Sequence, residues 1–176
     1  MPPAFRRSCW EHDRPGARRH SHKGRGDVSG ADVTDPDSLA RAIADTMLAA
    51  EGTGPAWGVE IEEARAGYAR IRMRLRPDML NGHGIAHGGM IFALADTAFA
   101  YACNGRNVRT VAAQASIVFL DQAKNGELLV AEAEEAALAG RAGVYNVSVR
   151  GEDGRAIAAF QGYSRSLGGA VIGESE

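Results

Sequence analysis

The sequence NGHGIAHGGMIFALADT, residues 81–97, contains four glycines and two histidines in its first nine positions. An apolar run of fourteen residues extends from Met90 to Cys103, and one carboxylate, Asp96, lies in the middle of it. A helix that is apolar on every side is a buried helix, and this one is too short to cross a bilayer. An ionised carboxylate in such a helix costs several kcal/mol unless it has a partner. Asp96 therefore has either a structural hydrogen bond or a function.

The glycines before the apolar run suggest what that function is. Gly88 and Gly89 fall where the helix should begin, and the first N–H groups of a helix have no internal acceptor. Because glycine has no side chain, a ligand oxygen can approach this backbone closely, as in an oxyanion hole. A carboxylate and an oxyanion hole are two parts of a site for acyl transfer or hydrolysis.

The spacing of these two parts sets a geometric limit. Gly88 and Asp96 are eight residues apart, which is roughly 12 Å along one helix. Both residues of one chain therefore cannot contact the same carbonyl carbon. An antiparallel copy of the helix could bring the partner's Asp96 near Gly88, so we expect a two-fold dimer with sites shared across its interface.

The composition is that of one globular domain. The chain has 176 residues, of which 45% are hydrophobic and 24% are charged. Its net charge of −2 gives no general reason to expect binding to nucleic acid or to a membrane surface. The two cysteines, Cys9 and Cys103, fit neither a disulfide framework nor a metal-binding motif, which favours a reducing cytoplasm.

Residues 1–33 differ from the rest of the chain. Their first 25 positions hold seven Arg or Lys against two acids, a local charge of about +5. They contain no apolar run of signal-peptide length and no usable periodicity, which predicts a disordered basic tail. A transit peptide, a basic arm for an acidic partner and a start site near Val28 remain alternatives. A weak metal site is another, with the candidate ligands Cys9, His12, His20 and His22.

The remaining pattern predicts an α+β fold with an antiparallel sheet. Asp35 can cap a helix that runs to Gly52. Alternation over residues 57–77 predicts two strands, whose solvated side carries Arg70, Arg72 and Arg74. The central helix follows, and four further strand-like segments cover residues 110–120, 127–138, 142–150 and 156–166.

The run from Asn81 to Asn104 resembles the signature of hotdog-fold acyl-CoA thioesterases, most closely of their PaaI-like, phenylacetate-pathway branch. The similarity extends over residues 37–167. It implies a hotdog fold, in which a curved antiparallel sheet wraps around one long central helix. It also implies homodimers that often assemble into tetramers. The expected domain covers residues 34–168, and residues 169–176 are expected to form a flexible C-terminal tail.

The resemblance assigns a role to each residue of the motif. Asp96 matches the catalytic carboxylate, which acts as general base on a water molecule or as nucleophile. Gly88 matches the residue whose backbone N–H polarises the thioester oxygen, and Gly89 lies beside it as a substrate contact. His87 and Asn81 match polar positions that orient substrate or water, although His87 could simply pack in the loop. The reaction needs no cofactor, because coenzyme A is part of the substrate, and the expected partners are an acyl-CoA and a second copy of the chain.

Two positions depart from the family pattern. Ala100 lies one turn after Asp96, where some relatives have a hydroxyl that helps to hold the water. Asp121 and Gln122 stand where many relatives have a basic residue and a proline. An acid is poorly suited to a coenzyme A phosphate, so the candidate phosphate contacts are Arg141, Lys124, Arg106 and Arg109.

Other chemistries have weaker support in the sequence. His83 and His87 form an H-x-x-x-H pair, but the glycines around them argue against a helix there and no third ligand follows, so we predict no metal site. No G-x-S-x-G elbow, P-loop or dinucleotide fingerprint occurs. Cys103 has no histidine near it in sequence and is expected to be a core residue.

The sequence therefore predicts an acyl-CoA thioesterase. A phenylacetyl-type acyl group is implied by the resemblance, and a medium-chain group fits the residues equally well. Three alternatives remain open. The first is a hotdog hydratase or dehydratase in which His87 acts, the second is a non-catalytic acyl-CoA-binding module in which Asp96 is structural, and the third is a basic-tailed interaction protein.

Overall fold

The structure, a computed structural model, describes residues 35–173. The tail predicted for residues 1–33 lies outside the described residues, as do residues 174–176. The described part forms, in chain order, α1 (Pro36–Ala50), α2 (Thr53–Trp57), β1 (Glu60–Arg65), β2 (Tyr68–Arg74), the 3-10 helix η1 (Pro77–Met79), α3 (Gly88–Asn104), β3 (Thr110–Phe119), β4 (Leu128–Ala139), β5 (Ala142–Gly151) and β6 (Ala156–Ser166).

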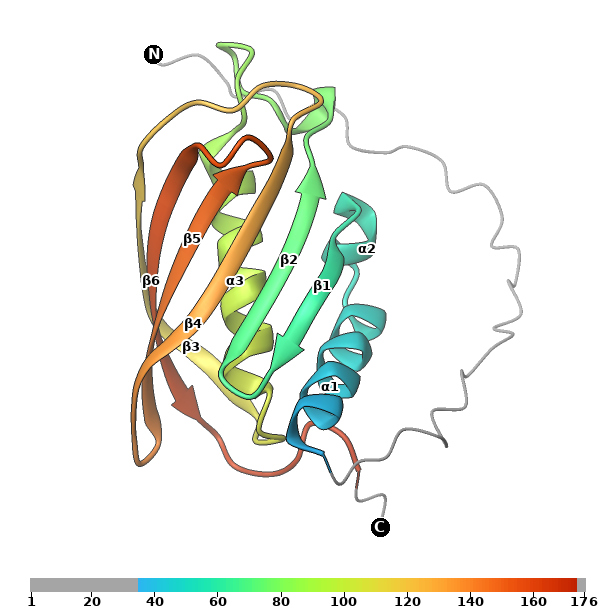
Figure 1. The fold of residues 1–176 in the computed structure, drawn as a ribbon, viewed down its shortest axis with the longest axis vertical. Helices are drawn as coiled ribbons and strands as arrows, with labels where there is room; N and C mark the ends of the chain where they lie inside the picture. Colours follow the sequence, from blue (N-terminus) through green and yellow to red (C-terminus); the bar gives the residue numbers. More distant parts are fainter. Residues whose placement is uncertain (1–34, 174–176) are drawn as a thin grey trace, which may run out of the picture.

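The strands form one six-stranded antiparallel sheet in the order β1-β2-β4-β5-β6-β3. The sheet curves around α3, which links β2 to β3 at the far edge (Figure 1). This arrangement confirms the predicted α+β fold and the hotdog architecture. The short helices α2 and η1 are additions that the sequence pattern did not predict.

Apolar residues, several of them alanine, line the sheet face that receives α3. The inward positions of β2 and β4 alternate with outward ones and are occupied by Ala69, Ile71, Met73, Leu129, Ala131 and Ala133. On β6, a Cβ placed at Gly162 would lie 3.0 Å from the ring of Phe99 on α3. At this point the close packing of helix on sheet depends on a glycine in β6 that lies against a large ring in α3.

Helix α1 begins and packs as its sequence predicts. The Ser38 N–H donates to the Asp35 carboxylate at 2.8 Å, which is the expected N-cap. Ile43 and Ala44 are buried where α1 packs against β1 and α3. At the end of α1, Glu51 accepts a 2.6 Å hydrogen bond from the Tyr101 hydroxyl, which ties α1 to α3.

The outer face of β1, β2 and β4 is charged and partly solvated, as predicted. Arg70 pairs with Glu62 and Glu132, and Arg72 pairs with Glu60 and Glu62. Pairs that are this exposed each contribute about 1 kcal/mol or less. The stability of these strands therefore comes mainly from the apolar residues on the buried side of the sheet.

Two surfaces are more exposed than their sequences suggest. The expectation that α3 is buried on every side is wrong for one stripe, which is only half-buried and consists of Phe92, Ala93, Asp96, Thr97 and Ala100. Strand β3 is exposed along most of its length, with Val118 61% and Phe119 51% exposed. Both surfaces are uncovered because β3 is the last strand of the sheet and no further strand of the described chain pairs with its outer edge.

Ordered contacts continue beyond residue 168, where the C-terminal tail was expected to begin. The side-chain oxygen of Asn107 accepts hydrogen bonds from the N–H groups of Val171 and Ile172, each at 3.0 Å. The Arg109 N–H donates to the Gly169 carbonyl at 2.9 Å. Residues 169–172 are therefore fastened to the loop that follows α3.

Candidate active site

The first turn of α3 presents one free N–H group and one capped N–H group. The Gly89 N–H donates to Nδ1 of His87 at 2.9 Å, so this imidazole is the N-cap of the helix. The Gly88 N–H has no acceptor within residues 35–173. Of the two glycines singled out from the sequence, only Gly88 has a donor available to a ligand.

The cap also favours one tautomer of His87. Since Nδ1 accepts the Gly89 N–H, it carries no proton, and the neutral ring carries its proton on Nε2. The imidazole is exposed and lies outside the lining of the pocket that borders Gly88. Within the described chain His87 therefore caps the helix, and its roles in orienting substrate or in catalysis stay predictions.

Asn81 shapes the loop that leads to the helix. Its Oδ1 accepts the N–H groups of His83 at 2.9 Å and Ile85 at 3.4 Å, and its own N–H donates to the Ile85 carbonyl at 2.8 Å. Gly84 has a φ of +73°, a left-handed conformation that glycine adopts without strain. The loop therefore places Asn81 at the rim of the pocket while it orders residues 81–85.

A pocket of about 510 Å³ lies against the start of α3. Its lining consists of Asn81, Ile85, Ala86, Gly88, Ile91, Phe119, Leu120, Asp121 and Gln122. A Cβ placed at Gly88 would lie 3.0 Å from Cζ of Phe119, so the aromatic ring lies directly over this glycine. A larger groove of about 660 Å³ on the outer sheet face includes neither Gly88 nor Asp96.

Asp96 lies on the half-buried stripe of α3, eight residues after Gly88 and therefore roughly 12 Å along the helix. Its carboxylate has no hydrogen-bond or ion-pair partner within residues 35–173, and burial raises its pKa. The structural hydrogen bond that could have explained this residue is thus absent from the described chain. Asp96 also does not line the pocket of its own chain, so the structure separates the two halves of the predicted site.

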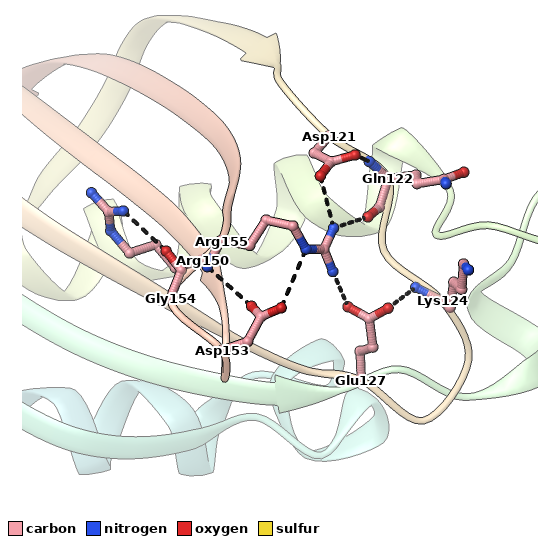
Figure 2. A network of polar contacts seen from close by, with 8 residues as sticks. All are labelled: Asp121, Gln122, Lys124, Glu127, Arg150, Asp153, Gly154 and Arg155. Carbon is pink, nitrogen blue, oxygen red and sulfur yellow. Dashed lines mark hydrogen bonds and ion pairs between the residues drawn. The ribbon is translucent and has the colours of Figure 1, made fainter.

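The pocket wall opposite the helix is the connection between β3 and β4. Asp121 stands where many relatives have a basic residue. Its carboxylate accepts a 3.1 Å hydrogen bond from Arg155. Arg155 also contacts Gln122, Glu127 and Asp153, and Figure 2 shows its guanidinium between them. The sequence does not reveal the role of Arg155, because this residue is 34 residues from Asp121 and no local pattern joins the two.

The four candidate phosphate contacts lie in different places. Lys124 belongs to the loop beside the pocket. Arg106 follows the far end of α3, where it pairs with Glu135, and Arg141 donates to the Ser166 carbonyl at 2.7 Å. Arg109 donates to the Gly168 carbonyl. Within one chain, only Lys124 is near Gly88.

Other candidate chemistries find little support in the described chain. Residues 35–173 contain no group of three or more His, Cys, Asp or Glu that could hold a metal ion. Burial raises the pKa of the Cys103 thiol to about 12, which is unfavourable for a nucleophile and typical of a core cysteine, as predicted. None of the described helices is both long enough and apolar enough to span a membrane. The metal ligands considered in the N-terminal tail lie outside the described residues.

Comparisons with known proteins identify relatives of this chain. A profile of the thioesterase superfamily matches residues 83–158, a range that contains Gly88, Asp96 and the β3–β4 connection. Acyl-coenzyme A thioesterase PaaI of Escherichia coli is 36% identical over 132 residues, which cover 75% of this chain and 94% of that protein.

Solved structures give the same result. The E. coli PaaI protein from the phenylacetic acid degradation operon superposes with a TM-score of 0.76 at 34% identity, over 77% of this chain and 99% of that one. A hypothetical thioesterase from Streptococcus pneumoniae, solved with coenzyme A, superposes with a TM-score of 0.62 at 25% identity, over 64% of this chain and 88% of that one.

Proposed function

This chain belongs to the thioesterase superfamily and is an acyl-CoA thioesterase, and we propose that it hydrolyses phenylacetyl-type acyl-CoA thioesters to the free acid and coenzyme A. The similarity to a protein of the phenylacetic acid degradation operon supports an aromatic acyl group. The apolar wall made by Ile85, Ile91 and Phe119 also supports it, because an aromatic ring gains from packing against another ring.

The observation that carries the proposal is the free N–H of Gly88 at the edge of an apolar pocket. In the proposed reaction, this N–H donates to the thioester oxygen and stabilises the negative charge that develops there. Attack on the carbonyl carbon then breaks the C–S bond, and coenzyme A leaves as a thiolate that takes up a proton. Asn81, at the rim of the same pocket, is suited to orient the water or the substrate.

Asp96 supplies the carboxylate of this reaction, either as general base on the attacking water or as nucleophile. Its unpartnered state and raised pKa support a group held ready for proton transfer. Ala100, one turn later, offers no hydroxyl to help hold the water, and Thr97 points about 100° away around the helix. Attack therefore relies on Asp96 and Asn81.

We further propose that the working unit is a two-fold homodimer in which the partner's Asp96 faces Gly88. Three features support it. The first is the roughly 12 Å between the two residues in one chain, the second is the uncovered edge of β3 and the third is the half-buried stripe on α3. A long exposed edge strand is a ready template for pairing with another chain. Further assembly into a tetramer, a cytoplasmic location and a reaction without metal or other cofactor remain part of the proposal.

A panel of thioesters tests the reaction and the substrate class together. Release of free thiol is measured with phenylacetyl-, hydroxyphenylacetyl-, benzoyl-, acetyl- and octanoyl-CoA, for the wild type and for Asp96→Asn. We expect fastest release from the aromatic acetyl thioesters and a loss of more than about 100-fold in the variant. Hydration of an enoyl-CoA is the control for the hydratase alternative. Tight binding without release would instead favour a binding module.

A pair of substitutions tests the oxyanion role of Gly88. Proline is well tolerated at the first position of a helix, and the preceding His87 already has φ −64° and ψ 130°, the conformation favoured before proline. Gly88→Pro therefore removes the N–H with little expected damage to the helix. Gly88→Ala adds a Cβ near Phe119 but keeps the N–H. We expect the proline variant to lose about 100-fold more kcat than the alanine variant, and equal losses would remove the N–H from the mechanism.

A further inference from the structure

We propose that Arg155 is a positioning residue for this reaction: its guanidinium holds the β3–β4 connection against residues 85–88, which keeps the Gly88 N–H open toward the pocket. This inference rests on the proposed function of Gly88. It concerns a residue that lies outside the pocket lining and is placed there by the turn between β5 and β6.

The guanidinium of Arg155 uses all three of its nitrogens. One terminal nitrogen donates to Asp121 at 3.1 Å and to the Gln122 carbonyl, and the other donates to Glu127 at 2.7 Å. Nε reaches Asp153 at 3.4 Å, and the Arg155 backbone N–H donates to the same carboxylate at 3.0 Å. A planar fork with several fixed donors joins separate segments in this way better than a single ammonium group does.

These contacts join two parts of the chain that are distant in sequence. Asp153 and Arg155 belong to the β5–β6 turn, whereas Asp121, Gln122 and Glu127 belong to the β3–β4 connection (Figure 2). Without the cation, the carboxylates of the connection would face Asp153 with no counter-charge. Arg155 therefore joins the β3–β4 loop to the β5–β6 hairpin of the sheet. Loops are in general more mobile than the strands they connect, so such a contact restrains the loop.

The β3–β4 loop in turn contacts residues 85–88, which lead into α3. Glu127, held by Arg155 through one carboxylate oxygen, accepts the Lys124 N–H with the other at 3.0 Å. Lys124 forms a β-bridge with Ile85, and the neighbouring Ala86 N–H donates to the Ala123 carbonyl at 2.8 Å. The next residues along the chain are His87 and Gly88. Hydrogen bonds and short stretches of backbone thus connect Arg155 to the start of α3.

A direct role for Arg155 in binding phosphate is the main competing interpretation. Three carboxylates face this one guanidinium, namely Asp121, Glu127 and Asp153. The Gln122 N–H and Arg155 lower the pKa of Asp121, and the Arg155 N–H lowers the pKa of Asp153, so these groups are ionised at neutral pH. Because three carboxylates already contact this one guanidinium, a phosphate group at Arg155 is disfavoured.

The test compares Arg155→Met and Arg155→Lys with the matched control Arg72→Met. Arg72 also pairs with two carboxylates, Glu60 and Glu62, but lies on the outer face away from the pocket. Two readouts are made on the full chain: kcat and KM for thiol release from phenylacetyl-CoA, and hydrogen exchange of peptides that cover residues 81–89 and 119–127. We expect Arg155→Met to lower kcat about 10-fold with a smaller change in KM, and to speed exchange in both peptides. Arg155→Lys should recover part of each effect.

Each outcome decides the inference. Faster exchange together with lower kcat, absent from the Arg72 variant, supports it. Unchanged exchange, or faster exchange with unchanged kcat, overturns it. A rise in KM alone would show that Arg155 binds the substrate directly and would also overturn it. If the wild type releases no thiol from any thioester, the proposed function has failed, and the exchange measurement still decides whether Arg155 orders residues 81–89.

Discussion

At the scale of single residues, Asp96 is the group whose chemistry departs most from that of an ordinary surface carboxylate. It is half-buried, and burial raises its pKa above the ordinary value of 3.8. No partner within residues 35–173 compensates for the lost solvation of the ionised carboxylate. A general base must be ionised, so we predict that kcat/KM falls on acidification with a midpoint clearly above that value. The pH profile of thiol release measures it. A midpoint at or below 3.8 would contradict the assignment of Asp96 as the base.

The same raised pKa makes a prediction about stability. The native state binds this proton more tightly than the unfolded state, so the stability linked to Asp96 is fully present below its unfolded pKa and is lost as the pH rises through its native pKa. Asp96→Asn removes the ionised group and should unfold at higher urea concentration than the wild type at pH 7. The difference should shrink as the pH falls. A variant that is less stable at pH 7 would instead indicate a structural partner for the carboxylate in the assembled protein.

His87 gives a prediction in which structure and catalysis can be separated. Loss of its cap in His87→Ala should cost about 1 kcal/mol of unfolding free energy, and His87→Asn should restore most of it because asparagine is a good N-cap. Urea denaturation measures both variants, and kcat is measured beside it. If His87 acts mainly through the helix terminus, activity follows stability in the two variants. Restored stability with lost activity would show that the imidazole contacts the substrate.

The sequence predicts some of these residues better than others, for a physical reason. Gly88 at a helix start and Asp96 within that helix follow from local spacing alone. The pairing of Arg155 with Asp121 does not, since it depends on a turn and a loop that meet only in the folded sheet. The capping role of His87 is also hidden, because Ser, Thr, Asp and Asn are the usual signals for an N-cap.

At the scale of elements, the contact of α3 with β6 depends on Gly162. A Cβ there would lie 3.0 Å from three atoms of the Phe99 ring, and that ring is also packed against Tyr145 and Phe160. We predict that Gly162→Ala destabilises the protein by about 1–3 kcal/mol through overpacking. Thermal or urea unfolding measures the loss.

A second glycine provides the control for this substitution. Gly52, between α1 and α2, has helical backbone angles of −89° and −25°, and a Cβ there would meet nothing within 4 Å. Gly52→Ala should therefore leave stability unchanged or raise it slightly. Equal losses in the two variants would show that the effect at Gly162 comes from the backbone and not from the contact with Phe99.

The sequence predicts the long helices and strands but not the short ones. The two long helices and six strands follow from periodicity, but α2 has five residues and η1 has three, which is too short for a periodic signal. The exposure of β3 and of one stripe of α3 is unpredictable for another reason. Both segments have the composition of buried elements, and the sequence does not say whether the covering surface comes from the same chain.

At the scale of the whole molecule, these uncovered surfaces and the divided site have one explanation. Within residues 35–173 of a single chain, the pocket holds the free N–H of Gly88, while Asp96 lies roughly 12 Å along the helix and has no partner. Pairing of two β3 edges would extend the sheet and cover the exposed stripe. A two-fold axis between antiparallel α3 helices would then bring each Asp96 to the other chain's pocket and complete two equivalent sites.

Mixing two inactive variants tests this arrangement. Asp96→Asn and Gly88→Pro are unfolded together in equal amounts and refolded, and thiol release is compared with that of each variant alone. If each site takes Gly88 from one chain and Asp96 from the other, half of the dimers are mixed, and each mixed dimer has one intact site. The mixture should regain about a quarter of the wild-type activity. If each site instead uses both residues of one chain, every chain carries a defect and the mixture stays inactive. Refolding each variant alone controls for damage by the procedure, and recovered activity in the mixture can arise only from a site built by two chains.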